Sequence, residues 1–155
     1  MREVWIIASF TTTCPGIADC LRNEVGVKDP ASLNDKKFIA LWDTGATNCV
    51  ITKNVALSLG LGPIGQTETL GVNGSAIVQV YIIEITLPNG IKILRQVTEG
   101  ISSGTWDVLI GMDVITMGDF CVSNFNGVTT FSFRVPSEGK TDFVQIDLAK
   151  QSTTA

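Results

Sequence analysis

Turn signals divide this chain at short intervals and limit what it can fold into. Asn-Gly pairs at 73–74, 89–90 and 126–127 are flanked by short runs rich in Val, Ile, Thr and aromatic residues. Such runs are typical of β-strands. Asn-Gly accepts the positive φ angles that tight hairpin turns require. The sequence therefore predicts an all-β fold made of short antiparallel strands.

The individual elements can be placed from these turns and from helix signals. A short helix is predicted over 17–23, a second between Thr52 and Gly60, and a third from 111 to about 118. We treat the 155 residues as a single domain with an insertion at 12–33, a core at about 37–135 and a loose tail at 137–155. Strands are predicted at 4–11, 37–42, 49–52, in two runs between 66 and 87, and at 91–97, 106–110, 120–123 and 128–135.

Charge and hydropathy argue against several kinds of partner. The formal net charge is -4 and no long basic cluster occurs, so we expect no nucleic-acid partner. The apolar run at 4–8 is too short for a membrane span or a convincing signal peptide, which predicts a soluble, cytoplasmic protein. The spacing of the four cysteines fits neither a metal site nor a disulfide framework. We expect reduced thiols, with Cys49 and Cys121 as inert core residues.

The sequence contains no histidine. This excludes a Ser-His-Asp triad, a Cys-His pair and zinc held by imidazole. Acid-base chemistry in this chain must therefore use carboxylates, Lys, Cys or Tyr.

The Asp43 carboxylate is flanked by sequence that few unrelated proteins would share by chance. The apolar run 37–42 leads directly into Asp43-Thr44-Gly45-Ala46, and the later segment 106–113 places Ile110-Gly111 before a predicted helix. Asp-Thr-Gly alone is weak, because it often forms a solvated turn. Together with the second segment and the hairpin between them, residues 37–135 resemble the retropepsins, the retroviral-type aspartic proteases.

This resemblance implies a small closed antiparallel acid-protease barrel with a flap hairpin and one or two short helices. Peptide hydrolysis without a metal or another cofactor requires a water activated between two carboxyls that share a proton. Because the chain has a single Asp-Thr-Gly, the resemblance implies a homodimer with Asp43 from each copy at the two-fold axis.

Neighbouring residues receive roles by the same resemblance. Thr44 is expected to hydrogen-bond across the dimer interface, Gly45 to let the backbone turn beneath the carboxyls, and Ala46 to line the substrate channel. A flap is expected to cover a bound peptide or protein substrate, and its residues are Gly71, Val72, Asn73 and Gly74.

Some positions depart from the retroviral pattern. Met112 stands where a basic residue is common, and Thr47-Asn48 replaces an acidic pair, so an ion pair near the active site is expected to be absent. Asp107 and Asp113 are interpreted as strand-end or helix-cap groups.

Two other functions stay open. One is a catalytically inactive barrel that binds peptide or protein, because fold does not prove function. The other is a structural all-β domain with a chance Asp-Thr-Gly, which the second segment disfavours.

Overall fold

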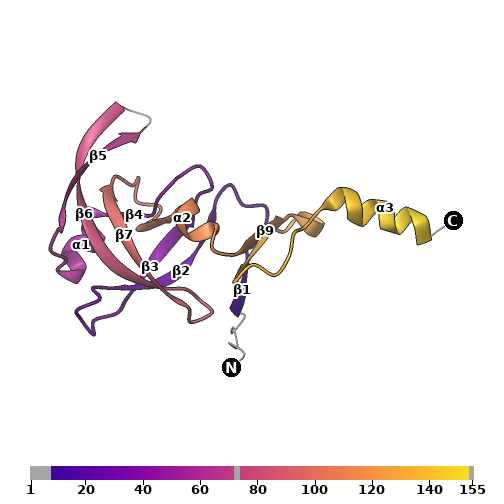
Figure 1. Cartoon of the computed structure of the whole chain (residues 1–155), viewed down its shortest axis with the longest axis horizontal. Coiled ribbons are helices and arrows are strands. Elements are labelled where there is room, and N and C mark those ends of the chain that lie inside the picture. The colour runs from indigo at the N-terminus through magenta and orange to yellow at the C-terminus, as the bar shows by residue number, and fades with distance from the viewer. Residues whose placement is uncertain (1–7, 72–73, 154–155) are drawn as a thin grey trace, which may run out of the picture.

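The computed structural model describes residues 8–71 and 74–153 and contains two β-sheets with short helices (Figure 1). The strands are β1 (Ala8–Thr13), β2 (Leu21–Lys28), β3 (Lys36–Trp42), β4 (Val50–Thr52), β5 (Gly65–Gly71), β6 (Gly74–Thr86), β7 (Lys92–Gly100), β8 (Val108–Ile110), β9 (Asp119–Ser123) and β10 (Thr130–Val135). The helices are α1 (Lys53–Leu59), α2 (Met112–Ile115), the 3₁₀ turn η1 (Phe125–Gly127) and α3 (Phe143–Thr153).

The larger sheet has seven strands in the order β2-β3-β8-β4-β7-β6-β5 and curls back on itself where β2 also pairs with β6. β3 pairs with β8, and β4 with β7, in parallel. The prediction of a mostly β fold is therefore confirmed, but its purely antiparallel character is wrong. Parallel pairs need a long connection, and here the chain between β3 and β8 supplies it. The closed barrel stays a prediction.

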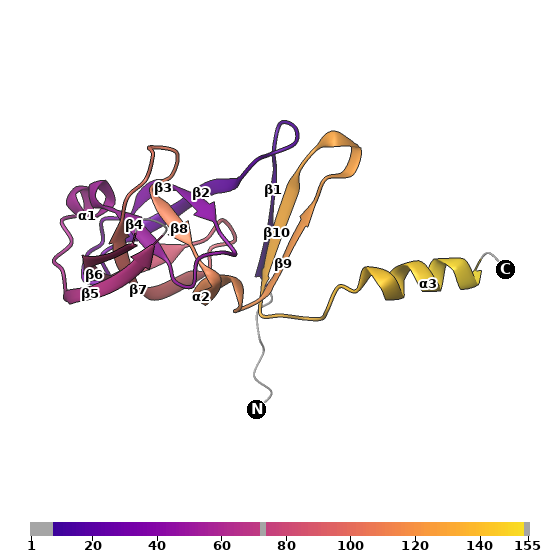
Figure 2. The same ribbon diagram turned by 90° about the horizontal axis from the view of Figure 1, so that it is seen from above.

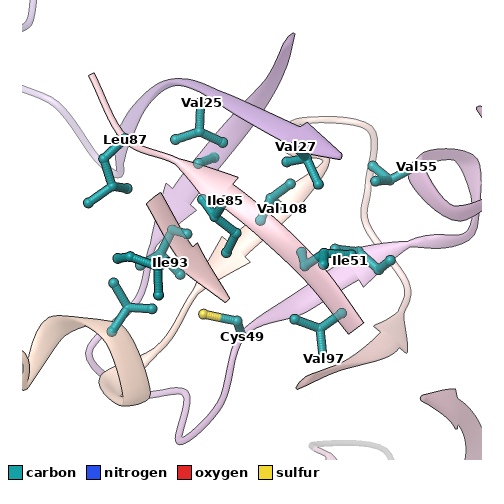
Figure 3. Close-up of a cluster of buried hydrophobic side chains, with 14 of the residues drawn as sticks. Val25, Val27, Cys49, Ile51, Val55, Ile85, Leu87, Ile93, Val97 and Val108 are labelled. Carbon is teal, nitrogen blue, oxygen red and sulfur yellow. The ribbon is translucent and has the colours of Figure 1, made fainter. Parts of the chain in front are cut away.

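The interior of this sheet is a single apolar cluster. Alternate side chains of the strands point into it, as Ile83 and Ile85 of β6 do, and both are fully buried. Figure 3 shows ten labelled members of the cluster, including the buried thiol of Cys49. Burial of so many branched side chains is the main force that holds the strands together.

The smaller sheet, in the order β1-β10-β9, stands beside the larger one (Figure 2). Phe10, Phe131 and Phe133 of this sheet pack against Trp42 at the end of β3, with ring centroids between 5.1 and 6.0 Å from the Trp42 ring. Phe120 stacks on the same indole at 5.4 Å. The end of the strand before Asp43 is therefore fixed between the two sheets.

The predicted helices had different outcomes. The second is confirmed as α1, because the Thr52 hydroxyl caps it and Gly60 ends it with a left-handed φ of 66°. The third is confirmed as α2. The first, at 17–23, is wrong: these residues lead into β2, which pairs with β3 from Leu21↔Trp42 to Val27↔Lys36. Long-range pairing there outweighs a weak local helix preference.

The ends of the chain also differ from expectation. Residues 4–7 of the predicted first strand lie outside the described residues, and β1 continues from Ala8 to Thr13. Part of the tail predicted to be loose forms α3, which extends away from both sheets (Figures 1 and 2). No helix in the described ranges is both long and apolar enough to cross a membrane.

Candidate active site

Asp43 follows β3 directly and is held by its own turn. Its backbone N–H donates to the Ile110 carbonyl at 3.0 Å, at the end of the neighbouring strand β8. The Gly45 N–H donates to Asp43 Oδ1 at 2.8 Å. The side chain of Asp43 is half-buried, so one carboxylate oxygen is fixed by the turn while the group still reaches the surface.

The glycine of the triplet leaves little space for a side chain. A Cβ on Gly45 would lie 3.1 Å from Asp43 Oδ1. That distance is tighter than ordinary van der Waals contact, so a larger residue would push the carboxylate out of place. Thr44, between the two, is exposed.

The second predicted motif lies directly against the first. The N–H groups of Met112 and Asp113, at the start of α2, donate to the carbonyls of Ala46 and Thr47 at 2.8 and 3.1 Å. A Cβ on Gly111 would lie 2.7 Å from the backbone carbonyl of Asn48. Only glycine permits so close an approach. The spacing read from the sequence therefore corresponds to a physical contact between the two segments.

A groove of about 390 Å³ opens at Asp43. Its wall is mainly apolar and comes from both sheets, because β9 contributes Phe120 and Val122. Sequence reasoning missed this wall, since no local signal connects β9 with Asp43. The lining residues are Asp19, Cys20, Leu21, Leu41, Trp42, Asp43, Thr44, Phe120 and Val122.

The hairpin predicted as a flap is formed by β5 and β6, with Gly71 opposite Gly74. Gly74 has φ 104°, a value that side chains rarely adopt. Leu70 and Ile77 on this hairpin are 88% and 75% exposed. The predicted tip residues Val72 and Asn73 lie outside the described residues.

Two acidic residues near the site have structural partners. Asp107 precedes β8 and accepts a hydrogen bond from the Ile39 N–H at 2.9 Å, as predicted for a strand-end group. The predicted helix-cap role of Asp113 is wrong, because Gly111 is the N-cap of α2 and no side chain caps this helix. The Asp113 carboxylate instead lies 3.7 Å from Arg95 Nε. An ion pair therefore does lie against the Asp43 loop, although Met112 and Thr47 take no part in it.

The cysteines divide into two groups. All four are free thiols, Cys49 is buried and Cys121 is exposed. The prediction of a core residue is thus confirmed for Cys49 and wrong for Cys121, because Phe120 takes the inward position and the next side chain must point outward. Burial raises the pKa of the Cys49 thiol well above its ordinary value. Across residues 8–71 and 74–153, no group of three or more Cys, Asp or Glu side chains could hold a metal ion.

A family model described as aspartyl protease matches residues 30–114, which is more than half of the chain. The chain belongs to this aspartyl protease family. The match includes Asp43-Thr44-Gly45, the β5–β6 hairpin and Ile110-Gly111. The predicted resemblance to retropepsin-like proteases is therefore confirmed.

A solved structure supports the assignment of the fold. The crystal structure of a retropepsin-like aspartic protease from Rickettsia conorii aligns with a TM-score of 0.54 at 17% identity, over 86% of this chain and 98% of that one. This similarity shows that the chain has a retropepsin-like fold. Two viral structures are also similar. The EIAV protease complexed with the inhibitor HBY-793 has a TM-score of 0.48 and 23% identity, and covers 63% of this chain and 86% of its own.

The other is a foamy viral protease-reverse transcriptase in complex with an RNA/DNA hybrid, with a TM-score of 0.44 and 21% identity. That alignment covers 59% of this chain and 11% of the viral chain. No curated protein sequence matches the chain.

Proposed function

We propose that the chain is an aspartic endopeptidase that hydrolyses peptide bonds with a water activated between the Asp43 carboxyls of two identical subunits. One observation carries this proposal. The Asp43 carboxyl of an aspartyl protease family member lies half-buried at an apolar groove, with its turn fixed from behind.

The chemistry requires two carboxyls in different protonation states. Two carboxyls held close together cannot both ionise, so they share one proton and act as a base and an acid. The ionised group takes a proton from water as the water oxygen bonds to the peptide carbonyl carbon, and the protonated group donates its proton to the carbonyl oxygen. The diol then collapses as the C–N bond breaks. The nitrogen takes a proton from one carboxyl, and a diol hydroxyl returns a proton to the other.

The second carboxyl is proposed to come from a second copy of the chain. The sequence contains Asp-Thr-Gly once, so a two-fold axis through Asp43 is the simplest way to supply a matching group. Thr44 is exposed beside Asp43, where its hydroxyl is available to the loop of the other subunit. Gly45 fixes the carboxylate through its N–H, and Ala46 is proposed to contact the substrate.

The substrate is proposed to be an extended peptide or an unfolded protein segment. The groove wall of Phe120 and Val122 suits an apolar side chain of such a peptide. The β5–β6 hairpin, at Gly71, Val72, Asn73 and Gly74, is proposed to fold over the bound peptide and donate backbone hydrogen bonds.

The first test is cleavage of an unfolded protein mixture at mildly acidic and neutral pH. Replacement of Asp43 by Asn keeps the size of the side chain but removes the ionisable group, so the rate should fall by about 10³-fold or more. Asp147→Asn, on the exposed helix α3, is the matched control and should cleave like the wild type. Equal turnover by the wild type and Asp43→Asn would reject the catalytic role of Asp43.

Mixing subunits tests the shared site. If one active site needs Asp43 from two copies, an excess of Asp43→Asn protein should capture wild-type subunits in inactive mixed dimers and reduce cleavage towards zero. Sedimentation at the same concentrations should show dimers. Wild-type activity that stays constant under a tenfold excess of Asp43→Asn protein would contradict a site built from two subunits.

An inactive binding module is the other outcome. In that case neither form cleaves, and both bind unfolded peptide with equal affinity.

A further inference from the structure

A polar network lies in the apolar interior behind the Asp43 loop, here defined as residues 43–49. Cys49 ends the loop and is fully buried, and its thiol donates to Asp113 Oδ1 at 3.1 Å. The Gly111 N–H in turn donates to the Cys49 sulfur at 3.5 Å. Burial and the adjacent carboxylate raise the pKa of Cys49, so the thiol keeps the proton that it donates.

Arg95 holds Asp113 from the opposite side. Arg95 projects from β7, and its Nε lies 3.7 Å from Asp113 Oδ2, which is a charge interaction rather than a hydrogen bond. Its Nη2 donates to the Asp113 backbone carbonyl at 3.0 Å. The two side chains are 27% and 18% exposed, so water screens the pair only in part.

Asp113 therefore fastens the loop at two points. Its carboxylate accepts the Cys49 thiol at the end of the loop, and its N–H donates to the Thr47 carbonyl in the middle. Asp43, at the start of the loop, is held separately by the Ile110 carbonyl on β8. The loop is thus fixed at both ends, and Arg95 anchors the distal end to β7.

We propose that Arg95 and Asp113 are positioning residues for Asp43. Together they hold the 43–49 loop at a fixed position relative to β7. The effect on catalysis rests on the proposed function, whereas the effect on the loop does not. Neither residue lines the groove at Asp43, so both act through the loop. A shift of about 1 Å in a reacting group is enough to reduce a rate by roughly 100-fold.

A contribution to stability alone is a poor account of this pair. Partly buried ion pairs seldom stabilise a fold more than apolar side chains of the same volume. Asp113 directs both its carboxylate and its N–H to the loop, while Arg95 donates to the Asp113 carbonyl as well as to the Leu94 carbonyl and the Met117 sulfur. The proposal therefore predicts that loop order and fold stability respond differently when the pair is changed.

The first experiment measures the loop directly and needs no enzymatic activity. In a background of Cys14→Ser, Cys20→Ser and Cys121→Ser, a thiol reagent reports on Cys49 alone. Asp113→Asn keeps an acceptor for the thiol but removes the charge that Arg95 holds. In both Asp113→Asn and Arg95→Met we expect Cys49 to be labelled at least about tenfold faster than any change in the denaturant midpoint explains, because the loop opens locally. Loss of the Asp113 charge also lowers the pKa of the Cys49 thiol, whereas Arg95→Met leaves that charge in place, so faster labelling in Arg95→Met reports opening of the loop.

Glu84→Gln is the matched control. The Glu84 side chain is 21% exposed and paired with Lys28 and Lys92, so it resembles Asp113 in burial and pairing but lies away from the loop. It should leave Cys49 labelling unchanged. An unchanged labelling rate in Arg95→Met as well would overturn the proposal.

The second experiment measures peptide cleavage. Asp113→Asn and Arg95→Met should each lower kcat about tenfold or more with KM nearly unchanged, because the groove is intact and only the alignment of Asp43 is lost. The double variant Arg95→Met/Asp113→Asn should be no worse than either single variant, since the pair acts as one unit. A kcat that falls only in proportion to the loss of folded protein would overturn the catalytic part.

The two proposals can fail separately. If the wild type cleaves no peptide, the proposed function fails, while the Cys49 labelling rates still decide whether Arg95 and Asp113 hold the loop.

Discussion

The Asp43 loop and the β5–β6 hairpin differ in how many contacts tie them to the rest of the fold. The loop is bonded to β8, to the start of α2 and, through Cys49, to the Arg95–Asp113 pair. In the hairpin, residues 74–79 of β6 pair with β5 alone, and β7 begins to pair only at Val80. An isolated two-stranded ribbon is only marginally stable in water. The contrast teaches that the fold fixes the carboxyl from several sides, whereas the described strands of its proposed cover are paired only with each other over residues 74–79.

The largest effect on stability and on cleavage is expected where the Asp43 loop contacts the start of α2. A Cβ at Gly111 would lie 2.7 Å from the Asn48 carbonyl, which is backbone and cannot move aside cheaply. Gly111→Ala should therefore destabilise the protein by about 3 kcal/mol and abolish cleavage. Urea unfolding checks the stability.

Gly62→Ala is the control for this substitution. Nothing lies within 4 Å of a Cβ at Gly62, so its effect should stay within about 0.5 kcal/mol. If Gly111→Ala were as harmless, α2 would not hold the loop and the contrast with the hairpin would disappear.

A smaller effect on stability, but a clear one on catalysis, is expected at Gly45. Its Cβ would crowd Asp43 Oδ1 at 3.1 Å, and a side-chain oxygen can shift where backbone cannot. Gly45→Ala should lower kcat by about 10- to 100-fold while changing stability by less than about 1 kcal/mol. The measurement is kcat beside a urea melt, and an unaltered kcat would mean that the position of the carboxylate is not critical.

Local signals in the sequence were sufficient for much of this fold. Thr52 and Gly60 delimit α1 because a hydroxyl cap and a left-handed C-terminal residue act within one turn of the helix. The hairpin turns were found for the same reason, since Asn-Gly sets its own backbone angles. The sequence links Ile110-Gly111 with Asp43-Thr44-Gly45 only through the resemblance to a family, and the contact of Gly111 with the Asp43 loop was not predicted.

What was missed depends on residues far apart in the chain. The helix predicted at 17–23 overlaps the first three residues of β2, and the rest of this strand was not predicted, because its pairing with β3 is invisible in a window of seven residues. The parallel pairing of β3 with β8 and the network of Cys49, Arg95 and Asp113 are likewise long-range. Cys121 was placed on the wrong face because an apolar run does not reveal which of its alternate side chains is buried.

In the hairpin we expect substitutions to weaken substrate binding with little loss of stability, whereas Gly111→Ala is expected to lower stability strongly. Leu70 and Ile77 are 88% and 75% exposed, so Leu70→Ala or Ile77→Ala should change stability by less than about 0.5 kcal/mol. If the hairpin covers a bound peptide, KM should nevertheless rise about three- to tenfold, through the loss of apolar contact. Leu33→Ala, at a side chain that is 98% exposed in another loop, should leave KM unchanged. Equal KM values in all three variants would mean that the hairpin does not touch substrate.

The smallest effect on the protein as a whole is expected in the tail, which belongs neither to the Asp43 loop nor to the β5–β6 hairpin. The Asp119 carboxylate on β9 accepts hydrogen bonds from the Ser137 hydroxyl and the Glu138 N–H, and pairs with Arg134. These donors, led by Ser137, hold the pKa of Asp119 below its ordinary value.

A lowered folded-state pKa means that the contact is complete above the unfolded pKa of about 4 and weakens as the pH falls below it. Hydrogen exchange at the Glu138 amide, corrected for the intrinsic pH dependence, should therefore lose protection below about pH 4. Asp119→Asn should lose that protection already at neutral pH, with urea stability and Cys49 labelling unchanged. Protection that persisted in Asp119→Asn would show that the tail is held by other contacts. A change in Cys49 labelling would show instead that the tail and the Asp43 loop are coupled through β9, whose Phe120 lies against Trp42.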